Sequence, residues 1–166
     1  MRTLISAPIA GWACATGASP TVGDAAPAGE EAARYGEVYD GRGKLLCPAF
    51  YNAHAHAPMT LLRGYAENLP LQAWLNDMVF PFEAKITPED CYWGTLLSCA
   101  EMARYGCVSF SDMYYHMEEG ARAALDAGIK MNLSDSLLAF NGEGLDDLPV
   151  KGNLDRLIRD LQGAGD

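Results

Sequence analysis

The stretch TPEDCYWGTLLSCAEMARYGCVSFSD, residues 87–112, decides the fold. Thr87 is predicted to begin a helix as its N-cap, and Asp90, three residues on, is placed to complete a short capping box. Apolar residues then recur at helical spacing until Gly106 ends the helix. Residues 107–112 follow as a strand with apolar side chains on one face. A helix that leads directly into a strand is the repeating unit of an α/β fold.

The same alternation extends in both directions from this stretch. Residues 45–53 form a mostly apolar run that predicts a strand buried on both faces. Residues 117–127 predict a second helix closed by Gly128, and residues 129–133 alternate as a third strand. Asn153 is predicted to cap a last helix. Strands that alternate with helices indicate a parallel sheet with crossover helices, but three strands are too few to close a barrel, which takes about eight.

The composition limits the kind of protein. The 166 residues carry 22 acidic and 12 basic side chains, which gives a formal net charge of -10, and 49% of them are hydrophobic. This length suits one domain, or one domain plus a fragment, with enough apolar material for a packed core. The basic residues are few and scattered, which argues against nucleic acid or an anionic membrane surface as a partner. No apolar stretch reaches the roughly 18 residues that a spanning helix needs.

The cysteines and the opening residues bear on where the protein works. Five cysteines without a C-x-x-C pair indicate reduced, mostly buried thiols, and therefore a cytoplasmic protein. Residues 1–19 imitate a secretory signal peptide, but Pro8 and Gly11 interrupt their apolar middle, so we expect a first strand over residues 3–9 instead. Residues 13–36 are rich in Ala, Gly and Pro and predict a loop or a poorly ordered stretch.

The sharpest chemical feature is the pair His54 and His56, at the carboxyl end of the predicted strand 45–53. Strand side chains repeat every two residues, so both imidazoles are expected on the same side, where they can converge on one metal ion. Their neighbours are alanines, which leave room for an ion and a substrate. Sites in βα architectures lie at the carboxyl ends of strands. The alternative is a pair of core or surface histidines satisfied by hydrogen bonds.

At these residues the sequence resembles the metal-dependent amidohydrolase superfamily, in the branch of the cytosine deaminases and chlorohydrolases that includes the S-adenosylhomocysteine and methylthioadenosine deaminases. The resemblance covers roughly residues 37–135 and rests on several blocks in a specific order. The blocks are LLCPAFYNAHAHAPM (45–59), LRGY (62–65), LQAWL (71–75), FPFE (80–83), YWGT (92–95), EM (101–102), FSDMY (110–114) and GIK (128–130).

This resemblance implies a fold and an activity. The family folds as a (β/α)8 TIM barrel attached to a small β-sandwich. Residues 1–46 are then a partial β-sandwich with a disordered-like stretch, and residues 47–166 are the first part of the barrel, about three βα units. His54 and His56 are implied to be the first two ligands of a divalent metal, zinc or alternatively iron. The implied reaction is hydrolysis of a C–N bond of a purine nucleoside or related heterocycle, a deamination.

Two further residues are implied to contact the substrate. The resemblance places Glu83 where its carboxylate accepts hydrogen bonds from ribose hydroxyls; the alternative is an exposed acid beside a helix. Trp74 is expected to form an apolar wall for the heterocycle, against the alternative of a core tryptophan. Asp112 is expected to be structural, and His116 has no assigned role.

Three departures from the family pattern stand beside these matches. Ala49 follows Pro48 where the family has glycine, and Asp135 stands where the adenosylhomocysteine deaminases carry an arginine for the substrate's carboxylate. No further strand follows before Asp166, so the family's third histidine, catalytic glutamate and metal-binding aspartate are absent. The chain is therefore expected to be an N-terminal fragment that is inactive alone.

Two other hypotheses remain open at this point. In one, the chain is a non-catalytic partial barrel that assembles with another chain, either a missing C-terminal half or a second copy of itself. In the other, it is an α/β small-molecule binder whose histidine pair is incidental. The fragment hypothesis instead gives a small-molecule heterocycle as the ligand, with no nucleic acid and no membrane as partner.

Overall fold

The computed structural model divides the chain into two compact units, Met1–Pro48 and Ala49–Asp166. Among the residues that the structure describes, no helix is both long enough and apolar enough to cross a membrane. The described residues are 2–6, 11–15, 21–23, 29–30, 37–40, 47–139 and 141–161.

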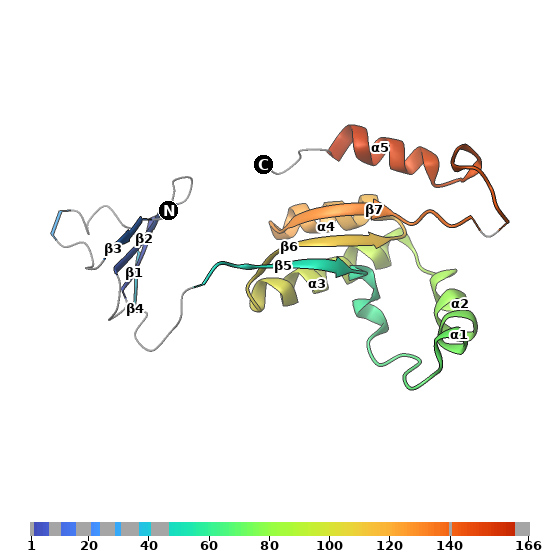
Figure 1. The fold of residues 1–166 in the computed structure, drawn as a ribbon, viewed down its shortest axis with the longest axis horizontal. Helices are drawn as coiled ribbons and strands as arrows, with labels where there is room; N and C mark the ends of the chain where they lie inside the picture. The colour runs from blue at the N-terminus through green and yellow to red at the C-terminus, as the bar shows by residue number, and fades with distance from the viewer. Residues whose placement is uncertain are drawn as a thin grey trace. The chain divides into compact units, whose positions relative to one another are not determined.

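The N-terminal unit contains a four-stranded sheet in the order β3-β2-β1-β4 (Figure 1). Strand β1 pairs antiparallel with β2 and parallel with β4, and β2 pairs antiparallel with β3. The strands are β1 (Arg2–Ser6), β2 (Gly11–Ala15), β3 (Thr21–Gly23) and β4 (Glu37–Asp40).

Two predictions for this unit have different outcomes. The strand expected over residues 3–9 is confirmed as far as Ser6, and residues 7–10 lie outside the described part of the chain. The loop expected over residues 13–36 is wrong where β2 and β3 form. The glycine and alanine residues of β2 have weak strand preferences, but β2 pairs with β1, and β3 pairs in turn with β2.

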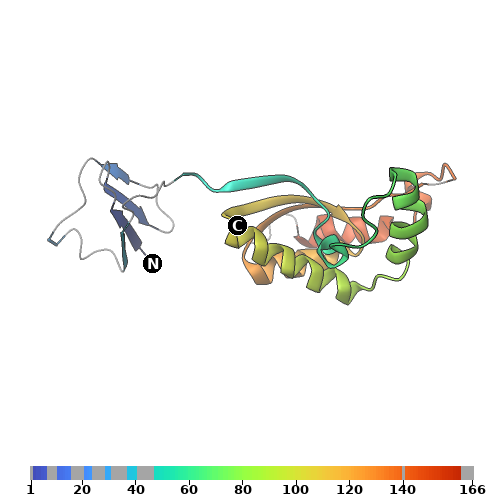
Figure 2. The same ribbon diagram turned by 90° about the horizontal axis from the view of Figure 1, so that it is seen from below.

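The C-terminal unit contains a parallel sheet in the order β5-β6-β7, made of β5 (Phe50–Ala55), β6 (Cys107–Tyr114) and β7 (Lys130–Asp135). Helix α3 (Pro88–Arg104) joins β5 to β6, and helix α4 (Met117–Ala127) joins β6 to β7. Figures 1 and 2 show both helices along one face of the sheet. The predicted mixed α/β fold with three parallel strands is therefore confirmed.

The core lies between this sheet and the two helices. Phe110 of β6 is 1% exposed and packs in one cluster with Cys99 of α3 and Ala124 of α4. Every second residue of β6 faces this side, so Asp112 and Tyr114 are buried as well. The core thus includes a carboxylate, which needs hydrogen-bond donors around it.

Strand β5 corrects the expectation of a strand over residues 45–53 buried on both faces. It begins at Phe50 and extends to Ala55, and it pairs only with β6 within the described sheet. Phe50 and Tyr51 are 63% and 76% exposed. Successive strand side chains point to opposite faces, so neither face of β5 is covered at these two residues.

Four cysteines whose side chains the structure describes have free thiols. Cys91 and Cys99 are buried, whereas Cys107 is half-buried and Cys47 is exposed. Burial is the main cause that raises the pKa of Cys91 to about 12 and that of Cys99 to about 11. Both thiols therefore stay protonated at neutral pH and act as small apolar core residues.

The N-terminus of α3 has the predicted capping box. The backbone N–H of Asp90 donates to Thr87 Oγ1 at 3.2 Å, and the backbone N–H of Thr87 donates to Asp90 Oδ2 at 2.9 Å. Helix α4 ends as predicted at Gly128, which has a left-handed φ of 70°. Asn153, in contrast, is not a cap, because it lies inside α5 (Lys151–Leu161).

Thr87→Ala is expected to lower the free energy of unfolding by about 1 kcal/mol, because the N-terminal N–H groups of α3 lose their side-chain acceptor. Thr87→Ser keeps the hydroxyl and should stay close to wild type. Urea unfolding of the three chains measures the difference. Equal stabilities of the Ala and Ser variants would contradict a role for the cap.

Between β5 and α3 the chain passes the carboxyl ends of the strands. Segment η2 (Ala57–Leu62) follows β5, and a continuous helical stretch comes next, made of α1 (Leu71–Ala73), η3 (Trp74–Val79) and α2 (Phe80–Glu83). Figures 1 and 2 show this stretch beyond the ends to which β5, β6 and β7 point. Trp74 and Glu83 therefore lie at the carboxyl ends of the strands, where His54 and His56 also lie.

Candidate active site at the carboxyl ends of the strands

His54 and His56 lie together at the end of β5. Their ring centroids are 4.8 Å apart, and the rings meet edge to face with an interplanar angle of 83°. His54 is exposed and His56 is half-buried. The spacing of two residues therefore brings both imidazoles to the same side, as the strand period requires.

The ring of His56 is oriented by the neighbouring strand. Its Nδ1 lies 2.6 Å from the backbone carbonyl oxygen of Met113 in β6. A carbonyl only accepts, so Nδ1 carries a proton, and in the neutral ring Nε2 then keeps its lone pair. Metal-binding histidines commonly donate their second ring N–H to a carbonyl in this way. His56 therefore fits a metal ligand through Nε2.

Asp112 holds the backbone that follows His56. Its two carboxylate oxygens accept from the Ala57 N–H at 3.1 and 3.2 Å, and Oδ1 also accepts from the Met113 N–H at 2.9 Å. Burial raises the pKa of Asp112, while these two N–H donors act in the opposite direction. The geometry gives Asp112 a structural part, which is to tie the end of β5 to β6.

His54 and His56 are the candidate metal ligands among the described residues. Among them no group of three or more His, Cys, Asp or Glu side chains is placed to hold an ion. A catalytic zinc site commonly uses three protein ligands and an open position. The two imidazoles would fill two of those three positions.

A cavity of about 250 Å³ opens beside the histidines. His56, Trp74 and Glu83 all line it, together with Tyr114 and Tyr115 at the end of β6. The structure thus brings one predicted metal ligand and both predicted substrate residues to the same space. His54 is not among the described residues that line it. The rest of the lining is mostly apolar, as in pockets for small organic molecules.

Tyr114 and Tyr115 also line this cavity, and the sequence analysis assigned neither of them a role. Burial is the main cause that raises the pKa of Tyr114 and of Tyr115, and the negative charge of Glu83 raises both further. Glu83 therefore faces two protonated phenol hydroxyls. The available signal was their position just past the second strand, on the rim where sites are built.

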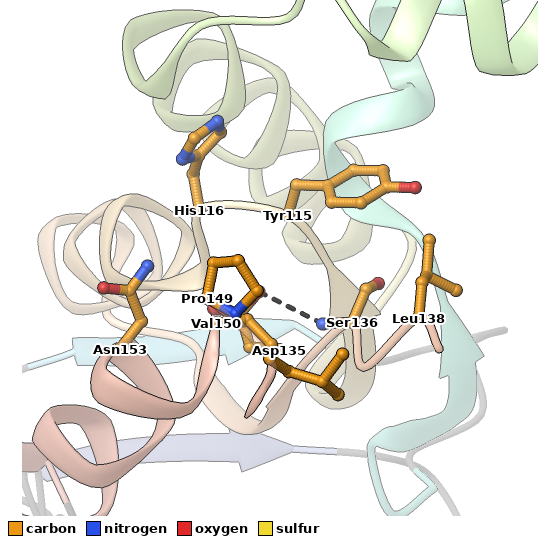
Figure 3. Close-up of a pocket in the computed structure, with 9 residues that line it drawn as sticks. Tyr115, His116, Asp135, Ser136, Leu138, Pro149, Val150 and Asn153 are labelled. Carbon is orange, nitrogen blue, oxygen red and sulfur yellow. Dashed lines mark hydrogen bonds between the residues drawn. The ribbon is translucent and has the colours of Figure 1, made fainter. Parts of the chain in front are cut away.

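A second cavity, of about 310 Å³, lies at the ends of β6 and β7 and shares Tyr115, Ser136 and Leu138 with the first. Figure 3 shows His116 and Asn153 on one side of it and Tyr115 and Leu138 on the other, with Asp135 between the two sides.

Asp135 is the ionisable group at the base of this second cavity. It is 2% exposed, and its Oδ1 accepts from the Ser136 N–H at 3.1 Å. Burial is the first cause that raises the pKa of Asp135 to about 6, and the charge of Glu118 adds to it, while His116 and the Ser136 N–H act against it. The sequence analysis singled out Asp135 because it stands where the adenosylhomocysteine deaminases carry an arginine, but it did not indicate that Asp135 is buried.

Asp135→Asn is expected to flatten the pH dependence of stability between about pH 4 and about pH 6. The folded chain keeps the Asp135 proton up to about pH 6, whereas the carboxyl has its ordinary pKa of 3.8 once the chain unfolds. This contribution to stability is complete below pH 3.8 and is lost as the pH rises through about 6. Urea unfolding across this range measures the slope. Exposed Asp146→Asn should keep the wild-type profile, and an unchanged Asp135→Asn profile would contradict the burial.

The family comparison agrees with this arrangement. The model of the amidohydrolase family matches residues 45–164. The 5-methylthioadenosine/S-adenosylhomocysteine deaminase of Syntrophomonas wolfei is 47% identical over 118 residues, which are 71% of this chain and 26% of that protein. The 5'-deoxyadenosine deaminase of Methanospirillum hungatei is 44% identical over 118 residues, again 71% of this chain and 26% of that protein. The chain spans about a quarter of the length of these relatives.

A solved structure is similar in fold as well. An adenosine deaminase from Xanthomonas campestris with bound zinc superposes with a TM-score of 0.65 at 30% sequence identity. The match covers 78% of this chain and 32% of that one. Since the family model covers most of the sequence, from the strand before the histidine pair to the last helix, this chain belongs to the amidohydrolase family.

Proposed function

We propose that the chain forms the first part of a metal-dependent aminohydrolase that deaminates a purine nucleoside or a related heterocycle. The observation that carries this proposal is the cavity lined by His56, Trp74 and Glu83. A histidine with a free Nε2, an aromatic wall and a carboxylate are the groups that such a reaction needs in one place. In the reaction, water replaces the ring amino group, which leaves a ring carbonyl and ammonia.

The residues of this chain have distinct parts in the proposal. His54 and His56 hold a divalent ion, zinc or iron, and Met113 keeps the His56 ring in its binding orientation. An ion held by these two residues would supply a water molecule of lowered pKa, available for hydrolysis at neutral pH. Trp74 packs against the heterocycle, and Glu83 accepts hydrogen bonds from the ribose hydroxyls.

The proposal extends to the fold. Residues 47–166 are the first three βα units of a (β/α)8 barrel, and residues 1–46 are a partial form of the family's β-sandwich. The remaining ligands and the proton-transferring glutamate belong to later barrel strands, which the relatives' greater length would accommodate. The 166-residue chain alone is then expected to have no turnover. The proposed location of the protein is the cytoplasm.

Metal retention tests the histidine pair. After loading with zinc and dialysis, the wild-type chain should retain zinc, and the His54→Ala/His56→Ala variant should lose at least about tenfold in affinity. The control is His116→Asn, which removes the third histidine of the chain with a residue that tolerates the left-handed φ of 52° at that position. Equal zinc content in the double variant and the wild type would overturn the assignment.

Ligand binding and turnover test the substrate class. Titration calorimetry of the zinc-loaded chain with 5'-deoxyadenosine should show binding that Trp74→Ala and Glu83→Gln each weaken by about tenfold. Unchanged affinity in both variants would contradict the pocket. Ammonia release from adenosine by the chain alone, abolished in His54→Ala, would contradict the expected inactivity.

A second candidate is a non-catalytic module that assembles with another chain or with its own copies. The exposed Phe50 and Tyr51 on the edge strand β5 favour it, because such an edge can pair with a further strand. Light scattering after size exclusion separates the candidates. A stable oligomer that retains no zinc supports the module, and a well-folded monomer that binds zinc argues against it.

A further inference from the structure

The two cavities are neighbours. Tyr115, Ser136 and Leu138 line both of them, so the cavities share part of their walls. Their volumes are about 250 and about 310 Å³. Ligand pockets typically measure about 300–1,000 Å³, so a ligand longer than a single heterocycle would need both.

The far cavity ends on a carboxylate that lacks a full set of donors. Asp135 Oδ1 accepts from the Ser136 N–H, but Oδ2 is buried without a hydrogen-bond partner among the described residues. Glu118 Oε2 is likewise buried without a partner in this part of the chain. Buried polar groups are nearly always paired, so an unpaired carboxylate oxygen beside a cavity indicates a missing donor.

The positive charges near Asp135 only partly offset the negative charge of its carboxylate. His116 lines the same cavity and favours the ionised carboxylate, and the first residues of α5 bring a helix N-terminus to it. A helix N-terminus carries only about half an elementary charge. No Lys or Arg is among the described residues that line the cavity. These groups only partly offset the ionised Asp135 carboxylate, so the cavity favours a cation.

We propose that the cavity ending on Asp135 binds a positively charged, N–H-bearing group of the substrate, and that Asp135 selects against substrates with a carboxylate in this position. This inference rests on the proposed function, because it places the heterocycle in the cavity beside His56. Asp135 is a binding and specificity residue and has no part in the bond that breaks. The substrate class is a nucleoside-like heterocycle whose tail ends in an amine.

Three adenosine derivatives that differ only at the 5' position test this proposal. They are 5'-deoxyadenosine, which is neutral there, 5'-amino-5'-deoxyadenosine, which is cationic, and adenosine-5'-carboxylate. Binding to the zinc-loaded chain is measured by titration calorimetry. The amine should bind about tenfold more tightly than the neutral compound, and the carboxylate about tenfold more weakly, as expected for one charge-assisted hydrogen bond or one repulsion.

Asp135→Asn should remove this ranking. The three compounds should then bind within about threefold of one another. Asp146→Asn is the matched control, because it removes the same charge from an exposed position that does not line the cavity, and it should keep the ranking. A wild type that binds all three compounds equally overturns the proposal while the proposed function stands.

A ring-free probe separates failure of this inference from failure of the proposed function. If 5'-deoxyadenosine does not bind the wild type, the heterocycle pocket is wrong. In that case n-butylammonium is titrated while the side-chain carboxyl resonance of Asp135 is followed by NMR. A shift in the wild type that the carboxylate analogue n-butyrate does not produce supports the cation subsite. No shift with n-butylammonium overturns it.

Discussion

Gly94→Ala is expected to lower the free energy of unfolding by about 2–3 kcal/mol, which is a large effect for one methyl group. A Cβ at this position of α3 would lie 2.5 Å from the carbonyl oxygen of Pro58 and 2.9 Å from the Pro58 Cα. Both are backbone atoms of a fully buried residue and cannot rotate away. Helix α3 would have to move off segment η2, which directly follows His56.

A second helical glycine offers a matched control. Gly152 lies in α5, and a Cβ added there meets no atom within 4 Å. Alanine gains about 1 kcal/mol over glycine in helix propensity at either site. Gly152→Ala should therefore stabilise the chain while Gly94→Ala destabilises it, and urea unfolding measures both. Two variants of equal stability would contradict the close approach of α3 to Pro58.

Asp112→Ala is expected to lower the free energy of unfolding by about 3 kcal/mol, because the Ala57 and Met113 N–H groups lose their acceptor. The Ala57 amide is buried and cannot turn to water instead. Asp112→Asn keeps one acceptor oxygen and should fall between Ala and wild type. Urea unfolding gives the stabilities, and faster hydrogen exchange at the Ala57 amide locates the change.

An exposed aspartate provides the comparison for Asp112. Asp155 pairs with Lys151 on the surface of α5 at 2.5 Å. Exposed ion pairs contribute about 0–1 kcal/mol, so Asp155→Ala should change the stability little. If Asp112→Ala were no worse than Asp155→Ala, Asp112 would not hold the end of β5.

Features that depend on a few consecutive residues were predictable from the sequence. The capping box of Thr87 and Asp90 needs only a spacing of three residues, and the shared side of His54 and His56 needs only the strand period. The order of strands and helices follows from where the apolar pattern changes between the strand period and the helix period. These signals lie in consecutive residues and do not depend on which other segment of the chain packs against them.

Features that depend on distant backbone were not predictable in this way. Strands β2 and β3 form because β2 pairs with β1 and β3 pairs with β2, which the Ala- and Gly-rich composition does not reveal. Phe50 and Tyr51 look like core residues until the strand is found at an edge. Likewise the charge of Asp135 is visible in the sequence, whereas its burial in a cavity against α5 depends on packing between elements.

The contact between His56 Nδ1 and the Met113 carbonyl joins residues that are 57 positions apart. It exists only when β5 and β6 are paired in their native register, since a one-residue slip would turn the side chains of a strand to the opposite face. The nitrogen-15 NMR signals of the His56 imidazole therefore report whether β5 and β6 are paired. A single ring tautomer in solution would signal a correctly assembled sheet, even before any ion or substrate is added.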